Sequence, residues 1–181
     1  MTNQPSYVAM TYDAPSADRN AAVSELFLAQ HARLVTLAQM LVGDLATAED
    51  VVQDAFAALY RRWTWLRDKG AAGGYVQTAV VNGARTQLRR RRHLSYVPVD
   101  ESIEIEAAAA DADLLRKEMH QVLSRGLAQL PIRQREVVVL RYYLDQSEQE
   151  IAATLSISRG SVKKHASRAL ATLGARLEGQ R

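Results

Sequence analysis

A cationic helix face near the C-terminus gives the clearest chemical signal in this sequence. Two short helical patterns, separated by a tight turn at Ser156 and Ile157, have the spacing of a helix-turn-helix. Cations and hydroxyls on the second helix of such a motif read base edges and neutralise phosphates in the major groove. The spacing therefore favours DNA binding over an ordinary solvated helix. The candidate residues are Arg159, Ser161, Lys163, Lys164, Ser167 and Arg168, with His165 near the edge of the face.

A second basic stripe lies on an expected helix from Tyr75 to about His93. Five arginines fall between positions 85 and 93, more than are needed to complement the dipole at a helix C-terminus. We interpret them as phosphate contacts, an attraction that must weaken as salt rises, with a well-capped helix end as the alternative. The stripe consists of Thr78, Asn82, Arg85, Arg89 and Arg92.

An acidic face on the preceding helix is more ambiguous. Asp50 and Asp54 stand one helical turn apart, with Gln53 beside them. Paired carboxylates can serve acid–base or metal chemistry, but no histidine is near and no second carboxylate pair completes a bundle metal site. The pattern by itself favours a solvated surface over a docking surface for a basic helix. We therefore predict no metal site.

Motifs for catalysis or cofactor binding are missing from the sequence. There is no phosphate-binding glycine loop, no nucleophile elbow and no cysteine. The sequence therefore predicts a protein that is not an enzyme and that needs no cofactor.

Beside the glycine-bearing loop at 67–74, Trp63 continues a buried stripe. Trp65 and Tyr75 remain open between core packing and stacking on unpaired bases.

Helices must position all of these residues, because apolar residues recur at helical spacing and strand signals are nearly absent. We predict an all-α protein with two small helical domains, preceded by a flexible tail at 1–20. The first domain, 21–93, has three helices, the second of which starts at a Thr47 N-cap. The second domain, 114–178, has four helices and ends in the helix-turn-helix. Its expected core includes Leu123, Leu127, Val137, Val138, Leu140, Leu144, Val162, Ala166, Ala169 and Leu170.

Charge divides the chain into blocks. A net charge of only +3 over 181 residues hides a segment, 94–113, that holds six carboxylates and no cation. We predict a flexible acidic linker there, although its alanines at 107–110 could instead join the next helix. The basic blocks on either side favour a polyanionic partner. No signal peptide or membrane-spanning stretch is evident, which predicts a cytoplasmic protein.

These motifs together resemble bacterial RNA polymerase sigma factors of the extracytoplasmic-function (ECF) group of the sigma-70 family, most closely its actinobacterial SigE-like members. The resemblance covers about 21–93 and 114–176, and three motifs in the family's order are far more specific than any one alone. The motifs are Ala-Glu-Asp-Val-Val-Gln-Asp-Ala-Phe at 48–56, similar to region 2.2; 75–92, similar to regions 2.3 and 2.4; and 130–143 followed by 147–170, similar to region 4.

The resemblance implies a sigma factor that binds core RNA polymerase and directs promoter-specific initiation without hydrolysing ATP. It reverses the interpretation of the acidic face, whose Glu49, Asp50, Gln53 and Asp54 would dock on the β′ clamp helices of the polymerase. Region 4 would meet the β flap, and the 94–113 linker would thread toward the RNA exit channel. An anti-sigma factor is a further partner that the family allows.

The resemblance also implies which residues contact the promoter. Asn82, Arg85, Arg89 and Arg92 would contact the −10 element, with the 67–74 loop holding a flipped base. Tyr75, Thr86, Ser161 and His165 depart from residues common in the family, which leaves the promoter sequence open. A stand-alone helix-turn-helix regulator is the alternative function. The −35 contacts would be Arg159, Ser161, Lys163, Lys164, His165 and Arg168.

Overall fold

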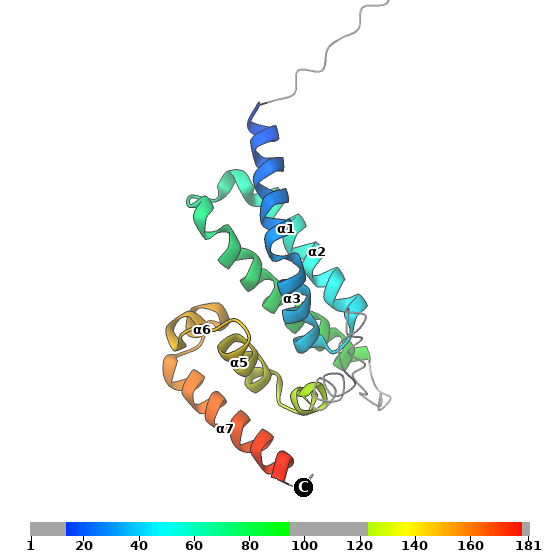
Figure 1. Ribbon diagram of the computed structural model, residues 1–181, viewed down its shortest axis with the longest axis vertical. Helices are drawn as coiled ribbons and strands as arrows, with labels where there is room; N and C mark the ends of the chain where they lie inside the picture. The colour runs from blue at the N-terminus through cyan, green and yellow to red at the C-terminus, as the bar shows by residue number, and fades with distance from the viewer. Residues whose placement is uncertain (1–13, 95–122, 179–181) are drawn as a thin grey trace, which may run out of the picture.

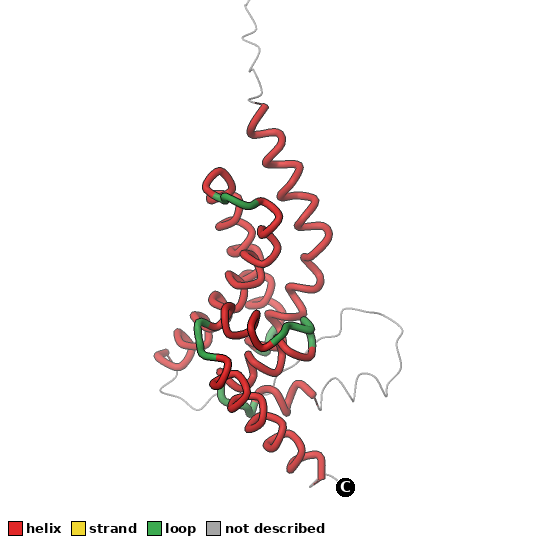
Figure 2. The backbone as a smooth tube through the Cα atoms, turned by 90° about the vertical axis from the view of Figure 1, so that its left-hand side faces the viewer, coloured by secondary structure: helices red, strands yellow, loops and turns green. Residues whose placement is uncertain are grey.

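Helices joined by short turns make up the described part of the chain, as Figure 1 and Figure 2 show. The computed structural model describes residues 14–94 and 123–178, and neither range contains a strand. The predicted all-α class is therefore confirmed. The elements are α1 (Ala14–Val42), α2 (Leu45–Arg62), α3 (Ala72–Leu94), a helical segment at 123–128, α5 (Ile132–Tyr142), α6 (Glu148–Leu155) and α7 (Arg159–Glu178).

The start of α1 differs from the prediction. Residues 14–20 are helical, so the expected flexible tail through residue 20 is wrong at its C-terminal end. Contacts to α2 support these extra turns, because Arg19 and Asn20 both hydrogen bond to the hydroxyl of Tyr60, each at 2.8 Å. The rest of that tail, and the predicted acidic linker beyond residue 94, lie outside the described residues.

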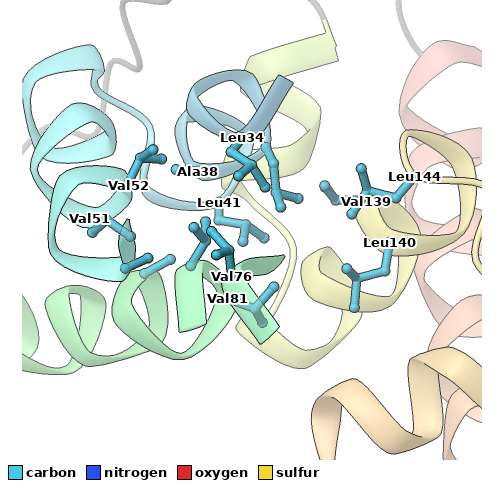
Figure 3. Packing of buried hydrophobic residues seen from close by; sticks show 14 of the residues in the cluster. Leu34, Ala38, Leu41, Val51, Val52, Val76, Val81, Val139, Leu140 and Leu144 are labelled. Carbon is cyan, nitrogen blue, oxygen red and sulfur yellow. The ribbon is translucent and has the colours of Figure 1, made fainter. Parts of the chain in front are cut away.

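The N-terminal unit packs α1, α2 and α3 around an apolar core, part of which Figure 3 shows. Apolar periodicity in the sequence predicts these positions as the inner faces of the three helices, and the structure confirms them, whereas Phe27 and Leu88 of the same predicted faces are only half-buried. Each fully buried large apolar side chain contributes about 1.5–3 kcal/mol relative to an exposed one. The buried side chains include Leu34, Leu37, Leu41, Val52, Phe56, Leu59, Trp63, Val76, Val80 and Ala84.

The corner between α1 and α2 depends on Gly43, which the sequence predicts as the stop of the first helix, and on Asp44, which the sequence prediction did not use. Gly43 ends α1 with a φ of 95°, a left-handed conformation that favours glycine. Asp44 then caps α2, its side chain accepting a hydrogen bond from the N–H of Thr47 at 2.8 Å. The predicted N-cap at Thr47 is therefore wrong by three positions, because a carboxylate already satisfies the first turn.

Two short 3-10 turns, η1 (Trp63–Trp65) and η2 (Lys69–Ala71), connect α2 to α3. The predicted loop ends earlier than expected, because α3 already begins at Ala72 and includes Gly73 and Gly74. A Cβ atom on Gly73 would lie only 2.8 Å from Nε2 of Gln30, so a larger residue here would displace the end of the Gln30 side chain of α1. The loop is thus short and anchored at both ends.

The C-terminal unit consists of segment 123–128, α5, α6 and α7. Pro131 immediately precedes α5, where its missing N–H costs nothing. Most of the predicted core is buried, but Leu123 and Leu170 are 47% and 46% exposed, so their assignment to the core is wrong. Whether a neighbouring element covers such a side chain is something that periodicity within one helix cannot reveal.

The two units pack against each other, with α5 lying on α1. In Figure 3, Leu34 and Leu41 of α1 lie between the α2–α3 side chains on one side and Val139 of α5 with Leu144, just beyond α5, on the other. Apolar packing therefore continues from one unit into the other. None of the helices in the described ranges is long and apolar enough to cross a membrane.

Candidate nucleic-acid interface

The helix-turn-helix of α6 and α7 is fixed by its caps. The spacing of Ser147 and Glu150 in the sequence predicts a capping box, and the structure confirms it: the N–H of Glu150 donates to Oγ of Ser147 at 3.3 Å, and the N–H of Ser147 donates to Oε2 of Glu150 at 2.8 Å. Hydrogen bonds from the side chain and then the backbone of Ser147 lower the pKa of the Glu150 carboxyl. Ser156 turns the chain with a φ of 53°, and Ser158 accepts the N–H of Ser161 at 3.1 Å to start α7.

The outer face of α7 carries the cations that the sequence places there. Val162, Ala166 and Ala169 are buried against α5 and α6, and this fixes the opposite face toward solvent. Lys163 has only a long contact of 3.7 Å with Glu148. The exposed members of the predicted set are Arg159, Lys163, Lys164, Ser167 and Arg168. Four cationic side chains are therefore available to a polyanion along a single helix face.

Ser161 and His165 sit at the margin of this face and are half-buried. The Oγ atoms of Ser158 and Ser161 lie 3.0 Å apart, so the Ser161 hydroxyl also closes the N-terminal turn of α7. Nδ1 of His165 is buried without a hydrogen-bond partner among the described residues. Ser161 and His165 thus lie at the margin of the cationic face of α7, where the sequence predicts His165 to lie near the edge.

The stripe on α3 divides into exposed and engaged residues. Asn82, Arg89 and Arg90 are exposed, and the described residues provide no ion-pair partner for either arginine. Arg92 lies on α3, but its side chain is outside the described part. The C-terminal half of α3 therefore offers cations to solvent, in line with the predicted phosphate contacts.

Thr78 and Arg85 are the described members of the stripe that are not exposed, and Arg85 is the arginine among them. Its Nε donates to Oε1 of Glu136 at 2.8 Å, and its Nη1 donates to Oδ1 of Asn82 at 3.1 Å. The side chain of Arg85 is 17% exposed and that of Glu136 only 2%, so this ion pair is largely shielded from water. Arg85 thus joins α3 of one unit to α5 of the other.

Arg91 has a structural task that the sequence did not reveal. Its guanidinium donates to Asp44 and, at 2.7 Å, to the hydroxyl of Thr47, which ties the end of α3 to the start of α2. Partial burial by itself would raise the pKa of Asp44. Hydrogen bonds from Thr47 and Arg91, together with the charge of Arg91, nevertheless hold that pKa below its usual value.

The acidic residues on α2 form an uncovered face. Glu49, Asp50, Gln53 and Asp54 are all exposed, whereas Val51, Val52, Ala55 and Phe56 on the other side are buried. No salt bridge between described residues involves these three carboxylates. Within the same ranges, no group of three or more potential ligands could hold a metal ion. The face is thus accessible to a partner.

The aromatic residues near the loop take different roles. Trp63 is 6% exposed and belongs to the core, as the sequence predicts. Trp65 is 84% exposed, and Tyr75 is partly buried against the core. The exposed cations Arg62, Arg67 and Lys69 surround Trp65 in the chain. An aromatic ring among cations can stack on an unpaired base.

Sequence reasoning missed the polar residues at the contact between the units. Arg135 is 6% exposed, and its guanidinium donates to the carbonyl of Leu41 at 2.7 Å and to that of Ala128. The hydroxyl of Tyr143 donates to the carbonyl of Arg33 at 3.1 Å. The one available signal is the pair Arg135–Glu136 directly before the apolar run 137–140, where helical phase makes one of them face inward.

Two family descriptions match this chain. The first, "Sigma-70 region 2", covers residues 26–94, and the second, "Sigma-70, region 4", covers residues 120–173. The first match spans α3 with its basic stripe and the acidic face of α2. The second spans the helix-turn-helix.

Two curated relatives are both named RNA polymerase sigma-E factor. The RNA polymerase sigma-E factor of Streptomyces avermitilis is 35% identical over 147 residues, covering 81% of this chain and 80% of the relative. That of Streptomyces coelicolor is 38% identical over 143 residues, covering 77% of each chain.

Solved structures resemble the described fold. The sigma factor RpoE of Bartonella quintana, in complex with the anti-sigma factor NepR, matches with a TM-score of 0.63 and 22% identity over 91% of this chain and 97% of that one. CnrH in complex with the cytosolic domain of CnrY matches with a TM-score of 0.66 and 24% identity over 93% of this chain and 100% of that one. At these identities the likeness concerns the fold.

Proposed function

This chain belongs to the sigma-70 family and is a sigma factor of the extracytoplasmic-function type, and we propose that its three exposed polar faces divide the work of initiation. As a sigma factor it binds core RNA polymerase and directs promoter-specific transcription initiation. One observation carries the proposed division: α2 exposes an acidic face, while α3 and α7 expose basic ones. An acidic face suits a basic protein surface, and basic faces suit DNA phosphates.

The acidic face of α2 docks on core polymerase in this proposal. Its carboxylates have no partner in the described chain, and charge complementarity would pair them with a cationic helix of the polymerase. The docking residues are Glu49, Asp50, Gln53 and Asp54. The basic face of α7 binds the −35 element through its major groove, and that of α3 binds the −10 element. The proposed DNA-contacting residues are those that the sequence predicts. Among them, Arg85 becomes accessible only when its ion pair with Glu136 breaks.

Strand opening needs no catalytic group in this proposal. Unstacking costs a few kcal/mol per base step, which base capture and phosphate contacts can offset. Asn82 and the 67–74 loop would hold an unpaired base, with exposed Trp65 available for stacking. Because bacterial transcription takes place in the cytoplasm, we propose that the protein works there.

Charge reversal on α2 tests the docking face. The variant Asp50→Lys/Asp54→Lys should bind core polymerase at least about tenfold more weakly, because like charges then oppose each other across the interface. Helical content should stay unchanged, since both side chains are exposed. Competition for core polymerase against the unmodified protein measures the affinity, and run-off transcription measures the activity.

The matched control reverses two carboxylates on another helix. Asp18→Lys/Glu25→Lys changes the net charge equally, and both residues are exposed on α1. The control should keep full core affinity. Equal binding by the α2 variant and the unmodified protein would rule out the proposed docking face, and equal losses in both variants would reduce it to a net-charge effect.

Regulation by a separate protein is part of the proposal. The two solved structures of similar fold are complexes with an anti-sigma factor or with a cytosolic domain of another protein. The exposed acidic and basic faces of this chain would suit such a partner. Co-purification with candidate partners, followed by inhibition of run-off transcription, tests this point.

A further inference from the structure

The contact between the two units contains polar groups that would meet water if the units separated. Tyr143 of the C-terminal unit donates to the carbonyl of Arg33 at 3.1 Å, and the side-chain amide of Gln146 donates to that of Gln77 at 3.3 Å. Both bonds cross from α1 or α3 to the segment around α5. They fix the position and orientation of α5 more closely than apolar packing does.

Two charged residues of α5 are buried and make hydrogen bonds to the N-terminal unit. Arg135 donates to the carbonyl of Leu41 at the end of α1, at 2.7 Å. Glu136 accepts from Arg85 at 2.8 Å and from Arg133 of its own helix at 3.2 Å. A charge with 2% of its side chain exposed needs such partners to offset its desolvation. The contact is therefore a specific one.

Arg85 cannot serve Glu136 and DNA at once. Its Nε is taken by Glu136, its Nη1 by Asn82, and its Nη2 is buried with no hydrogen-bond partner among the described residues. A phosphate or base edge would need these same donors in an accessible position. The bond to Asn82 also occupies the amide oxygen of a second residue of the −10 set.

We propose that the Arg85–Glu136 pair is an intramolecular lock: in the free protein Glu136 holds the arginine that promoter DNA engages once the C-terminal unit has moved away. The carboxylate of Glu136 takes the place of a DNA phosphate, one anion exchanging for another on the same guanidinium. This inference rests on the proposed role of Arg85 at the −10 element.

The lock leaves the other proposed surfaces accessible. Asp50 and Asp54 on α2 are exposed, as are Lys163 and Lys164 on α7. Core polymerase can therefore bind the closed form, and separation of the units can follow that first contact. A lock of this kind reduces DNA binding by the free protein in proportion to the closed fraction, without blocking assembly.

Spin labels on the two units measure whether the lock holds. The chain has no cysteine, so Ser24→Cys on α1 and Ala171→Cys on α7 give two unique labelling sites, both exposed. Pulsed EPR on the full chain should give one short distance. Adding Glu136→Gln should convert part of that population to longer distances, because the neutral amide no longer pairs with the Arg85 guanidinium.

DNA binding gives the second readout. The probe is the single non-template strand of a promoter fragment on which the reconstituted holoenzyme initiates. Free Glu136→Gln protein should bind it more tightly than the unmodified chain, by up to about tenfold if about nine-tenths of the latter is closed and the variant is fully open. Asp145→Asn is the matched control: it removes one exposed carboxylate of the same unit, at a residue with a φ of 53° that asparagine tolerates.

A second variant avoids the charge of Glu136 altogether. Tyr143→Phe removes only the hydroxyl that bonds to the carbonyl of Arg33 across the contact. It should shift the distances and the affinity in the same direction as Glu136→Gln, by a smaller factor. Unchanged distances and affinities in both variants, or an equal gain with Asp145→Asn, would overturn the lock.

The −10 assignment is judged separately in the holoenzyme. Arg85→Ala should lower initiation on that promoter, because a phosphate or base contact is lost. Normal initiation by Arg85→Ala would overturn the proposed role of Arg85 at the −10 element and, with it, the functional meaning of the lock. Unchanged distances in Glu136→Gln, together with reduced initiation by Arg85→Ala, would overturn the lock alone.

Discussion

The helices α3 and α7 both carry a basic stripe, but they commit their cations differently. On α7, Arg159, Lys164 and Arg168 are exposed and have no ion-pair partner among the described residues. On α3, Arg85 is held by Glu136 and Arg91 by Asp44, while Arg89 and Arg90 point to solvent. The same residue type therefore serves structure at some positions of α3 and recognition at others.

The position of each helix in the fold explains this difference. The helix α7 packs one side on α5 and α6 and leaves the other side uncovered in the described structure. The helix α3 contacts α1 and α2 and also reaches Glu136 of α5, so its long arginines find carboxylates within the protein. A basic stripe thus indicates accessible cations only where no neighbouring element supplies an anion.

The largest effect that would sharpen the comparison is expected on α7. Lys163→Ala/Lys164→Ala/Arg168→Ala should weaken binding to a −35 duplex by about a hundredfold, as three contacts of about 1 kcal/mol each would predict. The salt slope should fall by about three units. Fluorescence anisotropy at several salt concentrations measures both quantities.

A control for that variant removes as many cations from the other unit. Arg61→Ala/Arg62→Ala/Arg67→Ala loses the same charge from exposed positions of the N-terminal unit. Its binding to the isolated −35 duplex should change by less than about threefold. Similar losses in both triple variants would indicate a general charge effect and would contradict a specific role for α7.

Two arginines of α3 allow a matched pair. Arg89→Ala should weaken −10 binding about tenfold and leave the free energy of unfolding unchanged, because its side chain has no partner in the described structure. Arg91→Ala should lower the free energy of unfolding by about 1 kcal/mol, since it loses half-exposed hydrogen bonds to Asp44 and Thr47. Urea unfolding and DNA binding on both variants measure the contrast. The opposite assignment of the two losses would refute the division of the stripe.

The smallest expected effect concerns the pH dependence at Asp44. Its pKa is lower in the folded chain, so its contribution to stability is present above the usual carboxyl pKa of about 3.9 and is lost as pH falls through the lowered value. Because the side chain is 40% exposed, we expect only about 0.5 kcal/mol. Asp44→Asn should flatten the acid side of the stability curve by that amount in urea unfolding between about pH 3 and about pH 6. An unchanged curve would show that the stabilising interaction between Arg91 and Asp44 does not depend on the charge of Asp44.

Local patterns predicted most of the elements. The capping box of Ser147 and Glu150, the break at Pro131 and the buried stripe through Val52, Phe56 and Leu59 follow from short-range spacing, and the structure confirms them. The cations of α7 were likewise visible, because their helix buries the opposite side. The ends of the helices are predicted less accurately than their existence. The early start of α1 depends on contacts with α2, which spacing along the chain does not contain. The N-cap at Asp44 rests on a local hydrogen bond from Thr47, supported by Arg91 of α3.

The partners of charged side chains were decided by the tertiary structure alone. Arg85 and Arg89 are one helical turn apart and equivalent in the sequence, yet one faces Glu136, 51 positions away, and the other faces solvent. Sequence by itself determined where the helices form and which faces are basic, because helical periodicity is a local property. The fold decided which of those charges are available, because that depends on desolvation and on anions brought close from distant parts of the chain.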